Sequence, residues 1–217
     1  SVKMHPLFDI YYYNQKDSLV TDINNAELDL GFRFAYREKF LFDNYRRYSL
    51  GTNYPVFTFH YKMGIPDFGG SDFNYKSIEL TLEDYFLLGS FGSTTYSIKA
   101  GKVFGTLPTL LLESPPGNET YFMNHGNFNL MNEYEFVMDN YAELFLTHSF
   151  HGFFLNKIPL IQKLKLREVA TFKMVYGTLS ESNRIANDYL KNTEPFYIGN
   201  TAPSPNPYME AGIGVEN

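Results

Sequence analysis

The chain of 217 residues contains no cysteine. It can therefore form neither a disulfide framework nor a zinc site with thiolate ligands. It also lacks any apolar run near the roughly 20 residues that a membrane-spanning helix needs, and its mean hydropathy is -0.29. If this chain enters a membrane, we expect it to do so as β-strands.

Positive charge is scarce as well, because the formal net charge is -6 and the pI is about 5.4. A nucleic-acid-binding protein would need a basic stripe, so we expect no nucleic-acid partner. What the chain does have is aromatic side chains, with 18 Tyr and 21 Phe. No polar, low-complexity linker interrupts the middle of the sequence, so we expect one architecture over residues 1–217.

The most informative segment is residues 26–37, in which apolar and charged residues alternate strictly. Leu30, Phe32 and Phe34 fall on one side of an extended chain, and Asp29 and Arg33 fall on the other. A period of two is that of a β-strand. A soluble strand is usually about five or six residues long, whereas about nine to eleven tilted residues cross a bilayer. The length of the alternation predicts a membrane-spanning strand with one lipid face and one polar face.

The same alternation returns along the rest of the chain. If the aromatic stretch from Leu7 to Tyr13 is counted as a further strand, the alternation predicts about eight strands and no long helix. We therefore expect an all-β fold, an antiparallel transmembrane β-barrel. This chain would supply about eight strands of a larger barrel. The other alternating segments lie at residues 57–63, 77–83, 96–100, 134–154, 164–176 and 209–215.

The connections between these segments differ in length. The link at residues 89–93 is tight, whereas those at residues 105–132 and 179–206 are long and rich in proline. Outer-membrane barrels have short turns on the periplasmic side and long loops outside. We therefore expect the two long links to be extracellular, although the link at residues 37–54 does not fit a short turn.

Charged residues on the polar side change sign from one predicted strand to the next. Opposite charges on adjacent strands can pair across the ladder, so we expect a lumen filled with ion pairs rather than a single-sign ring of an ion-selective pore. The alternative is that these residues form the solvated outer face of a soluble sheet. The predicted structural network consists of Glu135, Asp139, Glu143, Lys165, Arg167 and Lys173.

The sequence offers little catalytic chemistry. The closest histidine pair, His148 and His151, would point to opposite faces of a strand, which disfavours a shared metal. Glu135, Asp139 and Glu143 share one face and could supply a general acid and base, but pairing with basic strands is a simpler use for them. The glycine-rich stretch at residues 67–74 lacks the spacing of a calcium loop. We predict no catalytic, cofactor-binding or metal-binding residues.

Three runs carry a resemblance to a known family: GKVFGTLPTLLLESPPGNETYF at residues 101–122, FNLMNEYEFVMDNYAELFLTHSFHGFFLNKIPLIQKLKLREV at residues 128–169, and YGTLSESN at residues 176–183. They resemble a Bacteroidota outer-membrane protein family of unknown function. Its members are commonly preceded by a carboxypeptidase-regulatory-like domain. The resemblance implies the Gram-negative outer membrane as the setting and a position in the C-terminal part of a longer barrel chain, and it carries over no catalytic residue.

Three functions are compatible with these observations. The first is an integral outer-membrane barrel with a non-enzymatic scaffold or accessory role in envelope assembly, export or uptake. Its partners would be outer-membrane lipid and other outer-membrane or periplasmic proteins. The second is a barrel enzyme of the lipid hydrolase type, and the third is a soluble ligand-binding β-barrel or sandwich. We expect the first, and we expect that the strands of this chain do not close on themselves. Because a sheet edge cannot stay unpaired in hydrocarbon, chain segments outside this sequence would pair with the two edge strands.

Overall fold

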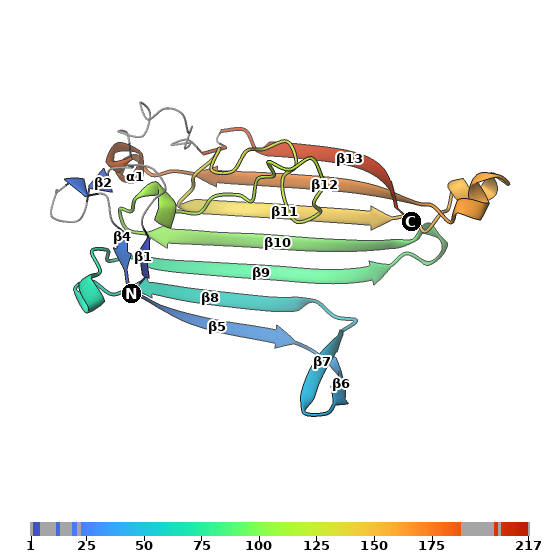
Figure 1. Cartoon of the computed structure of the whole chain (residues 1–217), viewed down its shortest axis with the longest axis horizontal. Helices are drawn as coiled ribbons and strands as arrows, with labels where there is room; N and C mark the ends of the chain where they lie inside the picture. The colour runs from blue at the N-terminus through green and yellow to red at the C-terminus, as the bar shows by residue number, and fades with distance from the viewer. Residues whose placement is uncertain are drawn as a thin grey trace.

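The computed structural model describes residues 2–4, 12–13, 19–20, 23–187, 202–203 and 205–216. Its main feature is one antiparallel sheet of seven strands (Figure 1). In spatial order these strands are β13 (Tyr208–Glu216), β12 (Arg167–Thr178), β11 (Asn140–Ser149), β10 (Ser93–Phe104), β9 (Lys76–Leu87), β8 (Val56–Gly64) and β5 (Glu27–Ala35).

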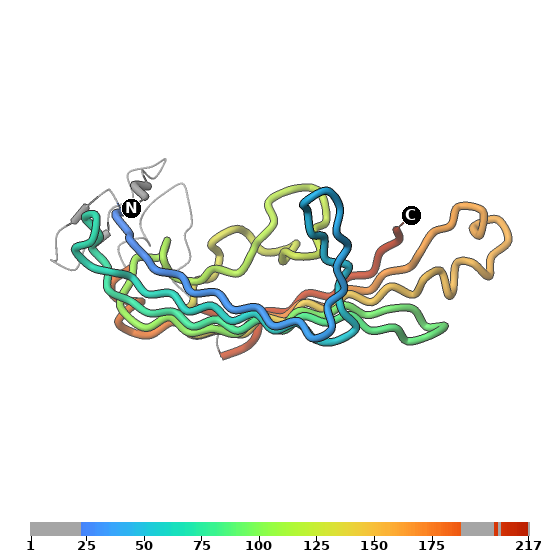
Figure 2. Tube along the Cα trace, turned by 90° about the horizontal axis from the view of Figure 1, so that it is seen from below, coloured from blue at the N-terminus to red at the C-terminus, as the bar shows by residue number. Residues whose placement is uncertain are grey.

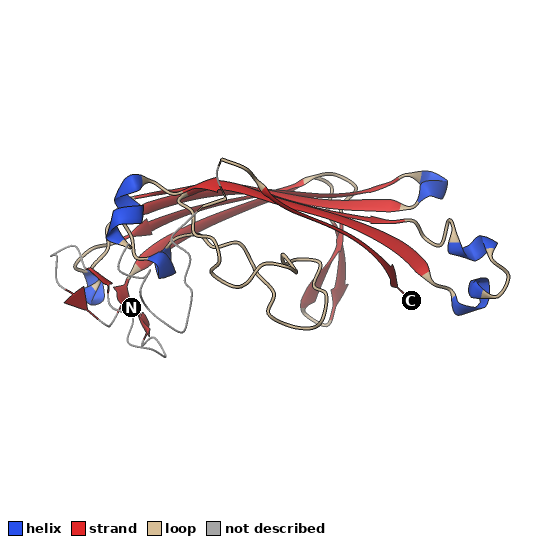
Figure 3. Ribbon diagram, turned by 90° about the horizontal axis from the view of Figure 1, so that it is seen from above, coloured by secondary structure: helices blue, strands red, loops and turns tan. Residues whose placement is uncertain are grey.

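Most of the smaller elements stand at the two ends of the large sheet, and one hairpin projects from the end of β5 (Figures 1 and 3). Two-stranded sheets are formed by β1 (Val2–Met4) with β4 (Ile23–Asn25), β2 (Tyr12–Tyr13) with β3 (Leu19–Val20), and β6 (Lys39–Asp43) with β7 (Arg46–Gly51). Among the described residues, helical structure consists of α1 (Glu181–Ala186) and 3-10 turns at Phe68–Gly70, Gly89–Phe91, Thr109–Leu111, Leu155–Lys157 and Ile161–Leu164. None of the described helices has the length and apolar character needed to cross a membrane.

The predicted antiparallel β fold is confirmed, with seven strands in the large sheet in place of the expected eight or so. Most of the predicted first strand, Leu7 to Tyr13, lies outside the described residues, and Tyr12–Tyr13 pairs with β3 instead of with the large sheet. Within the described residues, β5 and β13 each have one edge without a neighbouring strand, so the sheet is open.

The register of the sheet places most apolar residues of one face opposite apolar residues of the neighbouring strands, with exceptions such as Ile78 opposite Lys102. Phe34 of β5 faces Phe57 of β8, and Ile98 of β10 faces Leu82 of β9 on one side and Leu144 of β11 on the other. Because side chains alternate between the two faces of a strand, this register collects most of the apolar residues on one face. The apolar face consists of Leu28, Leu30, Phe32, Phe34, Phe57, Phe59, Tyr61, Met63, Ile78, Leu80, Leu82, Ile98, Ala100, Ala142, Leu144, Leu146, Phe172, Met174, Met209, Ala211, Ile213 and Val215.

The links follow the lengths that the sequence indicates. The link from β9 to β10 is tight and depends on Gly92, whose φ is 103° and whose missing Cβ would lie 1.8 Å from the carbonyl oxygen of Ser149. The two long links leave the same end of the sheet, because β10 and β12 run in the same direction. At the opposite end, the hairpin of β6 and β7 accounts for the length of the link between β5 and β8.

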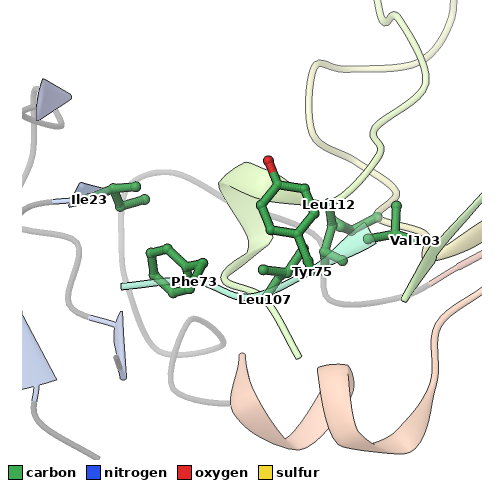
Figure 4. Close-up of a cluster of buried hydrophobic side chains, with 7 residues drawn as sticks. Ile23, Phe73, Tyr75, Val103, Leu107 and Leu112 are labelled. Atoms are coloured by element: carbon green, nitrogen blue, oxygen red, sulfur yellow. The ribbon is translucent and has the colours of Figure 1, made fainter. Parts of the chain in front are cut away.

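Residues 105–139, which we call the covering segment, fold back over the sheet and lie against one of its faces (Figure 2). A first buried cluster forms where this segment leaves β10, and Figure 4 shows its side chains. There Tyr75 donates a hydrogen bond to Glu27 over 2.5 Å, and burial raises the pKa of Tyr75 to about 12, so it remains a donor at neutral pH. The cluster consists of Ile23, Phe73, Tyr75, Val103, Leu107, Leu112 and Val137.

The predicted twenty-residue strand from Tyr134 to Phe154 is wrong at both ends, since β11 begins at Asn140 and ends at Ser149. Tyr134 has a φ of 56°, which is incompatible with an extended strand. Val137 and Met138 belong to the covering segment instead of to the strand, and both are fully buried. The strand predicted from Leu164 likewise begins only at Arg167, because Lys165 has a φ of 52°.

Candidate functional site

The candidate site is the polar face of the sheet, on which the covering segment lies. Glu79, Lys99, Glu143, Lys173 and Glu210 all stand on this face, since each is offset by one residue from an apolar-face neighbour on its strand. Glu143 and Lys173 are 2% exposed although both carry ionisable groups. Such groups are stable in a buried position only when they are paired or hydrogen-bonded.

The first group of partners surrounds Lys99 of β10. Its Nζ lies 2.6 Å from Oε1 of Glu113 in the covering segment and 3.3 Å from Oε2 of Glu143 on β11. The neighbouring Tyr141 donates a hydrogen bond over 2.7 Å to Glu79 of β9, and Lys99 Nζ stands 5.3 Å from the centre of its ring. One cation therefore joins two strands and the covering segment.

Negative charge exceeds positive charge in this group. Oε1 of Glu143 is buried and has no hydrogen-bond partner among the described residues. Beside it lies an open-sided pocket of about 470 Å³, to which His125 of the covering segment also contributes. No group of three or more metal-ligating side chains occurs in the described part of the chain.

A second set of contacts fastens the covering segment to the last two strands. Lys173 of β12 donates to the carbonyl oxygens of Asn124, over 2.8 Å, and Asn127. Glu210 of β13 accepts hydrogen bonds from the N–H groups of Asn129 and Leu130, each over 2.8 Å. Charged groups that bind main-chain atoms hold a loop in one conformation more strongly than neutral ones do.

Apolar side chains also hold the covering segment on the sheet. Phe128 of the covering segment is fully buried, with its ring centre 5.0 Å from that of Phe145 on β11 and 5.8 Å from that of Tyr208 on β13. Met131 and Met138 join it in a second buried cluster. The covering segment thus has a hydrophobic core of its own against the polar face.

A third network lies where the covering segment begins. Asp139 accepts hydrogen bonds from the N–H of Ser180 and from Asn183, both over 2.9 Å. Asn183 in turn accepts from the N–H of Leu107, and Asn187 accepts from that of Thr109, each over 2.8 Å. The two asparagines are almost completely buried, and no periodic pattern in the sequence indicates that they would be.

The six residues of the predicted charge network fall in different places, and no two of them pair with each other among the described residues. Glu143 belongs to the Lys99 group, Lys173 binds the covering segment and Asp139 binds Ser180 and Asn183. Glu135 accepts from the N–H of Asn132 within the covering segment. Lys165 ends a 3-10 turn, and Arg167 begins β12. The pairing partner of Glu143, Lys99, was not among the six.

A serine and a histidine meet at the other end of the sheet. Oγ of Ser93, the first residue of β10, lies 2.9 Å from Nε2 of His151, and Thr94 Oγ1 lies 2.8 Å from Nδ1 of His148. Ser93 is 7% exposed. The contact with His151 arises because residue 151 follows the end of β11, where the face alternation of a strand no longer applies.

Comparison with known proteins gives one match. A family model described as "Family of unknown function (DUF5686) C-terminal domain" matches residues 10–182. No curated protein and no solved structure matches the chain.

Proposed function

The chain belongs to the family of unknown function DUF5686, as its C-terminal domain, and from this premise we propose that it is part of an integral outer-membrane β-barrel. The observation that carries the proposal is the apolar face, which the described chain leaves open. Phe32 is 64% exposed, Leu80 48% and Ile213 91%. A soluble protein would bury such a face in its core, and exposed apolar patches of this extent mark contact with lipid or a partner.

The dimensions of the apolar face support lipid as the contact. On β9 it is bounded by Lys76 and Asp84, which are about 27 Å apart along a strand. At the usual tilt of ~40° this span corresponds to about 20 Å along the membrane normal, close to the ~25 Å apolar band of outer-membrane barrels. The boundary positions suit head groups, because a lysine such as Lys76 can extend its charge toward water.

Aromatic residues stand at both limits of the apolar face, as in the girdles of membrane barrels. Phe86 and Tyr96 lie at one limit with ring centres 6.2 Å apart, and Tyr96 donates to Asp84 over 3.5 Å. Phe104 and Tyr176 lie toward the other limit, and the Nζ of Lys102 stands 5.3 Å from the ring centre of Phe104.

Within this setting we propose a non-enzymatic scaffold or accessory role. The covering segment occupies the polar face over β10 to β13, which favours a fixed interior over an open channel. Exposed apolar residues project instead from the hairpin of β6 and β7, where Phe42 is 74% exposed, and from the link between β11 and β12, where Leu160 is 81% exposed. Such residues suit contact with other envelope proteins.

The family resemblance supports a Bacteroidota source and a preceding carboxypeptidase-regulatory-like domain, which we include in the proposal. The short-link end of the sheet, with the hairpin, would then face the periplasm. Outer-membrane and periplasmic proteins are the partners that could reach it.

Fractionation of cells that make the intact polypeptide tests the membrane assignment. We expect the protein in outer membranes, resistant to extraction by alkaline carbonate and released by detergent. Release by carbonate alone would contradict the proposal.

The scaffold role is tested by co-purification from detergent-solubilised membranes, with Phe42→Ser in the hairpin compared with Tyr121→Ser in the covering segment. Partners should be lost only with Phe42→Ser, and an identical set in both variants would contradict the role of the hairpin.

The contact between Ser93 and His151 favours a second candidate, a lipid hydrolase at the membrane boundary. A serine within hydrogen-bond reach of a histidine is the arrangement that activates a nucleophile. Release of fatty acid from phospholipid vesicles by the reconstituted protein, abolished by Ser93→Ala and unaffected by Ser97→Ala, would establish it. Equal release by wild type and Ser93→Ala would eliminate it.

A further inference from the structure

We infer that a pocket at the base of the β6–β7 hairpin binds a phosphate ester. The pocket has a volume of about 560 Å³ and lies where the hairpin leaves the ends of β5 and β8 (Figure 1). The end of β9 contributes one wall through Tyr85. This place is the short-link end of the sheet, and it is separate from the contacts between the covering segment and the polar face.

Positive charge gathers around this pocket in a chain that is acidic as a whole. Residues 33–54 contain five Lys and Arg against two Asp and Glu, whereas the net charge of the chain is -6. Arg37 and Lys39 line the pocket, and neither forms an ion pair with another described residue. None of the described residues that line it is acidic. Two cations without a counter-charge at one cavity attract an anion.

The carboxylate nearest in sequence is engaged elsewhere. Glu38 lies between Arg37 and Lys39 in the chain, but its two oxygens accept hydrogen bonds from Nη1 and Nη2 of Arg33, over 2.8 and 2.9 Å. Ser49 also donates to Glu38 over 2.5 Å. A bidentate pair of this kind is among the strong charge-assisted contacts. The charge of Glu38 is thus compensated by Arg33, and Arg37 and Lys39 keep theirs for a ligand.

The walls of the pocket are joined to each other without a ligand. Thr52 donates to the carbonyl oxygen of Tyr36 over 2.5 Å, and it accepts a hydrogen bond from the N–H of Tyr54 over 3.2 Å. The rings of Tyr36 and Tyr54 meet edge to face with their centres 5.0 Å apart. The guanidinium carbon of Arg37 stands 5.4 Å from the ring centre of Tyr36. A preformed pocket costs less ordering when a ligand binds.

The lining favours phosphate over other anions. Arginine presents a planar fork of N–H donors and lysine a point charge, and both are common partners of phosphate. A phosphate monoester carries about -1.5 to -2 charges at pH 7, which matches Arg37 and Lys39 together better than a carboxylate does.

The size and the aromatic walls indicate an organic part beside the phosphate. Tyr54 is 40% exposed and Tyr85 48%, so ring surface is available to the ligand. The volume also falls within the range of about 300–1,000 Å³ that small organic ligands occupy. We therefore assign an ester in place of free phosphate.

Two sources could supply such an ester. Tyr85 stands next to Asp84 and Phe86, at the limit of the apolar face, which is the level of lipid head groups in the proposed membrane setting. A soluble phosphate ester could enter from the short-link side instead. Both sources present the same phosphate group to Arg37 and Lys39, so the experiment has one arm for each.

Calorimetry on the intact polypeptide, purified in a non-ionic detergent and phosphate-free buffer, tests the site. The soluble probe is glycerol 3-phosphate, with glycerol and glycerate as its neutral and carboxylate counterparts. The lipid probe is dihexanoyl phosphatidic acid. Arg37→Gln and Lys39→Gln each remove one cation from the pocket. Arg46→Gln is the matched control, because it removes a cation of the same hairpin that does not line the pocket.

We expect saturable binding of glycerol 3-phosphate at one site per chain, and none of glycerol. Arg37→Gln and Lys39→Gln should each raise the Kd at least about tenfold, since each removes a charge-assisted hydrogen bond. Arg46→Gln should change it less than about twofold, and Lys39→Arg, which keeps the charge, less than about threefold. Tighter binding of the dihexanoyl ester than of glycerol 3-phosphate would support the site with lipid as the source, and the reverse order would support it with a soluble source.

Three results would overturn the inference. They are the absence of saturable binding of either ester, binding of glycerate as tight as that of glycerol 3-phosphate, and a loss of affinity in Arg46→Gln equal to that in Lys39→Gln. The last result would mean that only the general charge of the hairpin attracts the probe. Because binding is measured in detergent, its failure leaves the membrane assignment untouched, and that assignment fails separately in the fractionation experiment.

Discussion

The two faces of the seven-stranded sheet are treated in opposite ways by the same chain. The apolar face, with Phe32 and Leu80, is left open, whereas the polar face of β10 to β13, with Glu143 and Lys173, is covered by residues 105–139. In water the reverse arrangement would be favoured, because burying apolar surface is the main driving force for folding. This difference between the faces is what supports the proposal that the apolar face contacts lipid.

The largest effect is expected from loosening the cover of the polar face. Phe128→Ala removes a fully buried aromatic side chain between Phe145 and Tyr208, and it should lower the free energy of unfolding by about 3–5 kcal/mol. Denaturant titration in detergent measures it. Phe122→Ala, at a residue that is 83% exposed, is the control and should change stability by less than about 0.5 kcal/mol. Equal effects would mean that the covering segment is not packed on the sheet.

The next effect compares the two faces on one strand. Leu80→Arg places a cation in the middle of the apolar face of β9 and should cost about 2–4 kcal/mol of membrane insertion. Thr81→Arg, the next residue, points to the polar face beside the 470 Å³ pocket. The fraction of protein that becomes resistant to carbonate extraction measures both. A worse outcome for Thr81→Arg would reverse the assignment of the faces.

A smaller effect is expected from the ion pairs on the polar face. Lys99→Met leaves Glu113 and Glu143 without their cation. Breaking a fully buried pair costs roughly 3–5 kcal/mol, and because the Lys99 side chain is 23% exposed we expect about 2 kcal/mol. Adding Glu143→Gln should recover part of the loss. Strict additivity of the two substitutions in a double-mutant cycle would show that the charges do not interact.

The sequence predicted the sheet well because its signal is local. Alternation over residues 26–37 identified β5. The same alternation indicates which residues of each strand in the large sheet lie on the apolar face. The covering segment could not be predicted in this way. Phe128 and Val137 bury themselves against residues far along the chain, and they lack the regular spacing that a strand or helix imposes.

For the candidate site, the sequence indicated the type of interaction but not the residues that take part in it. Alternating signs on neighbouring strands suggested that Glu143 pairs with a cation on an adjacent strand. That this cation is Lys99 depends on the register of β10 with β11, in which these two residues are direct partners. Lys173 and Glu210 are also register partners, yet both bind main-chain atoms of the covering segment. A sequence pattern identifies which side chains share a face and leaves open what covers them.

The central claim is that lipid contacts the apolar face, and spin labels on β9 of the membrane-embedded protein test it most directly. Single cysteines at Ile78, Leu80 and Leu82 sample the apolar face, and those at Ser77 and Thr81 sample the polar face. We predict that oxygen dissolved in the bilayer relaxes the first three labels more than a water-soluble nickel chelate does, with the preference lost at Ser77 and Thr81. The same preference at all five positions, or a preference for the chelate at Leu80, would contradict the claim.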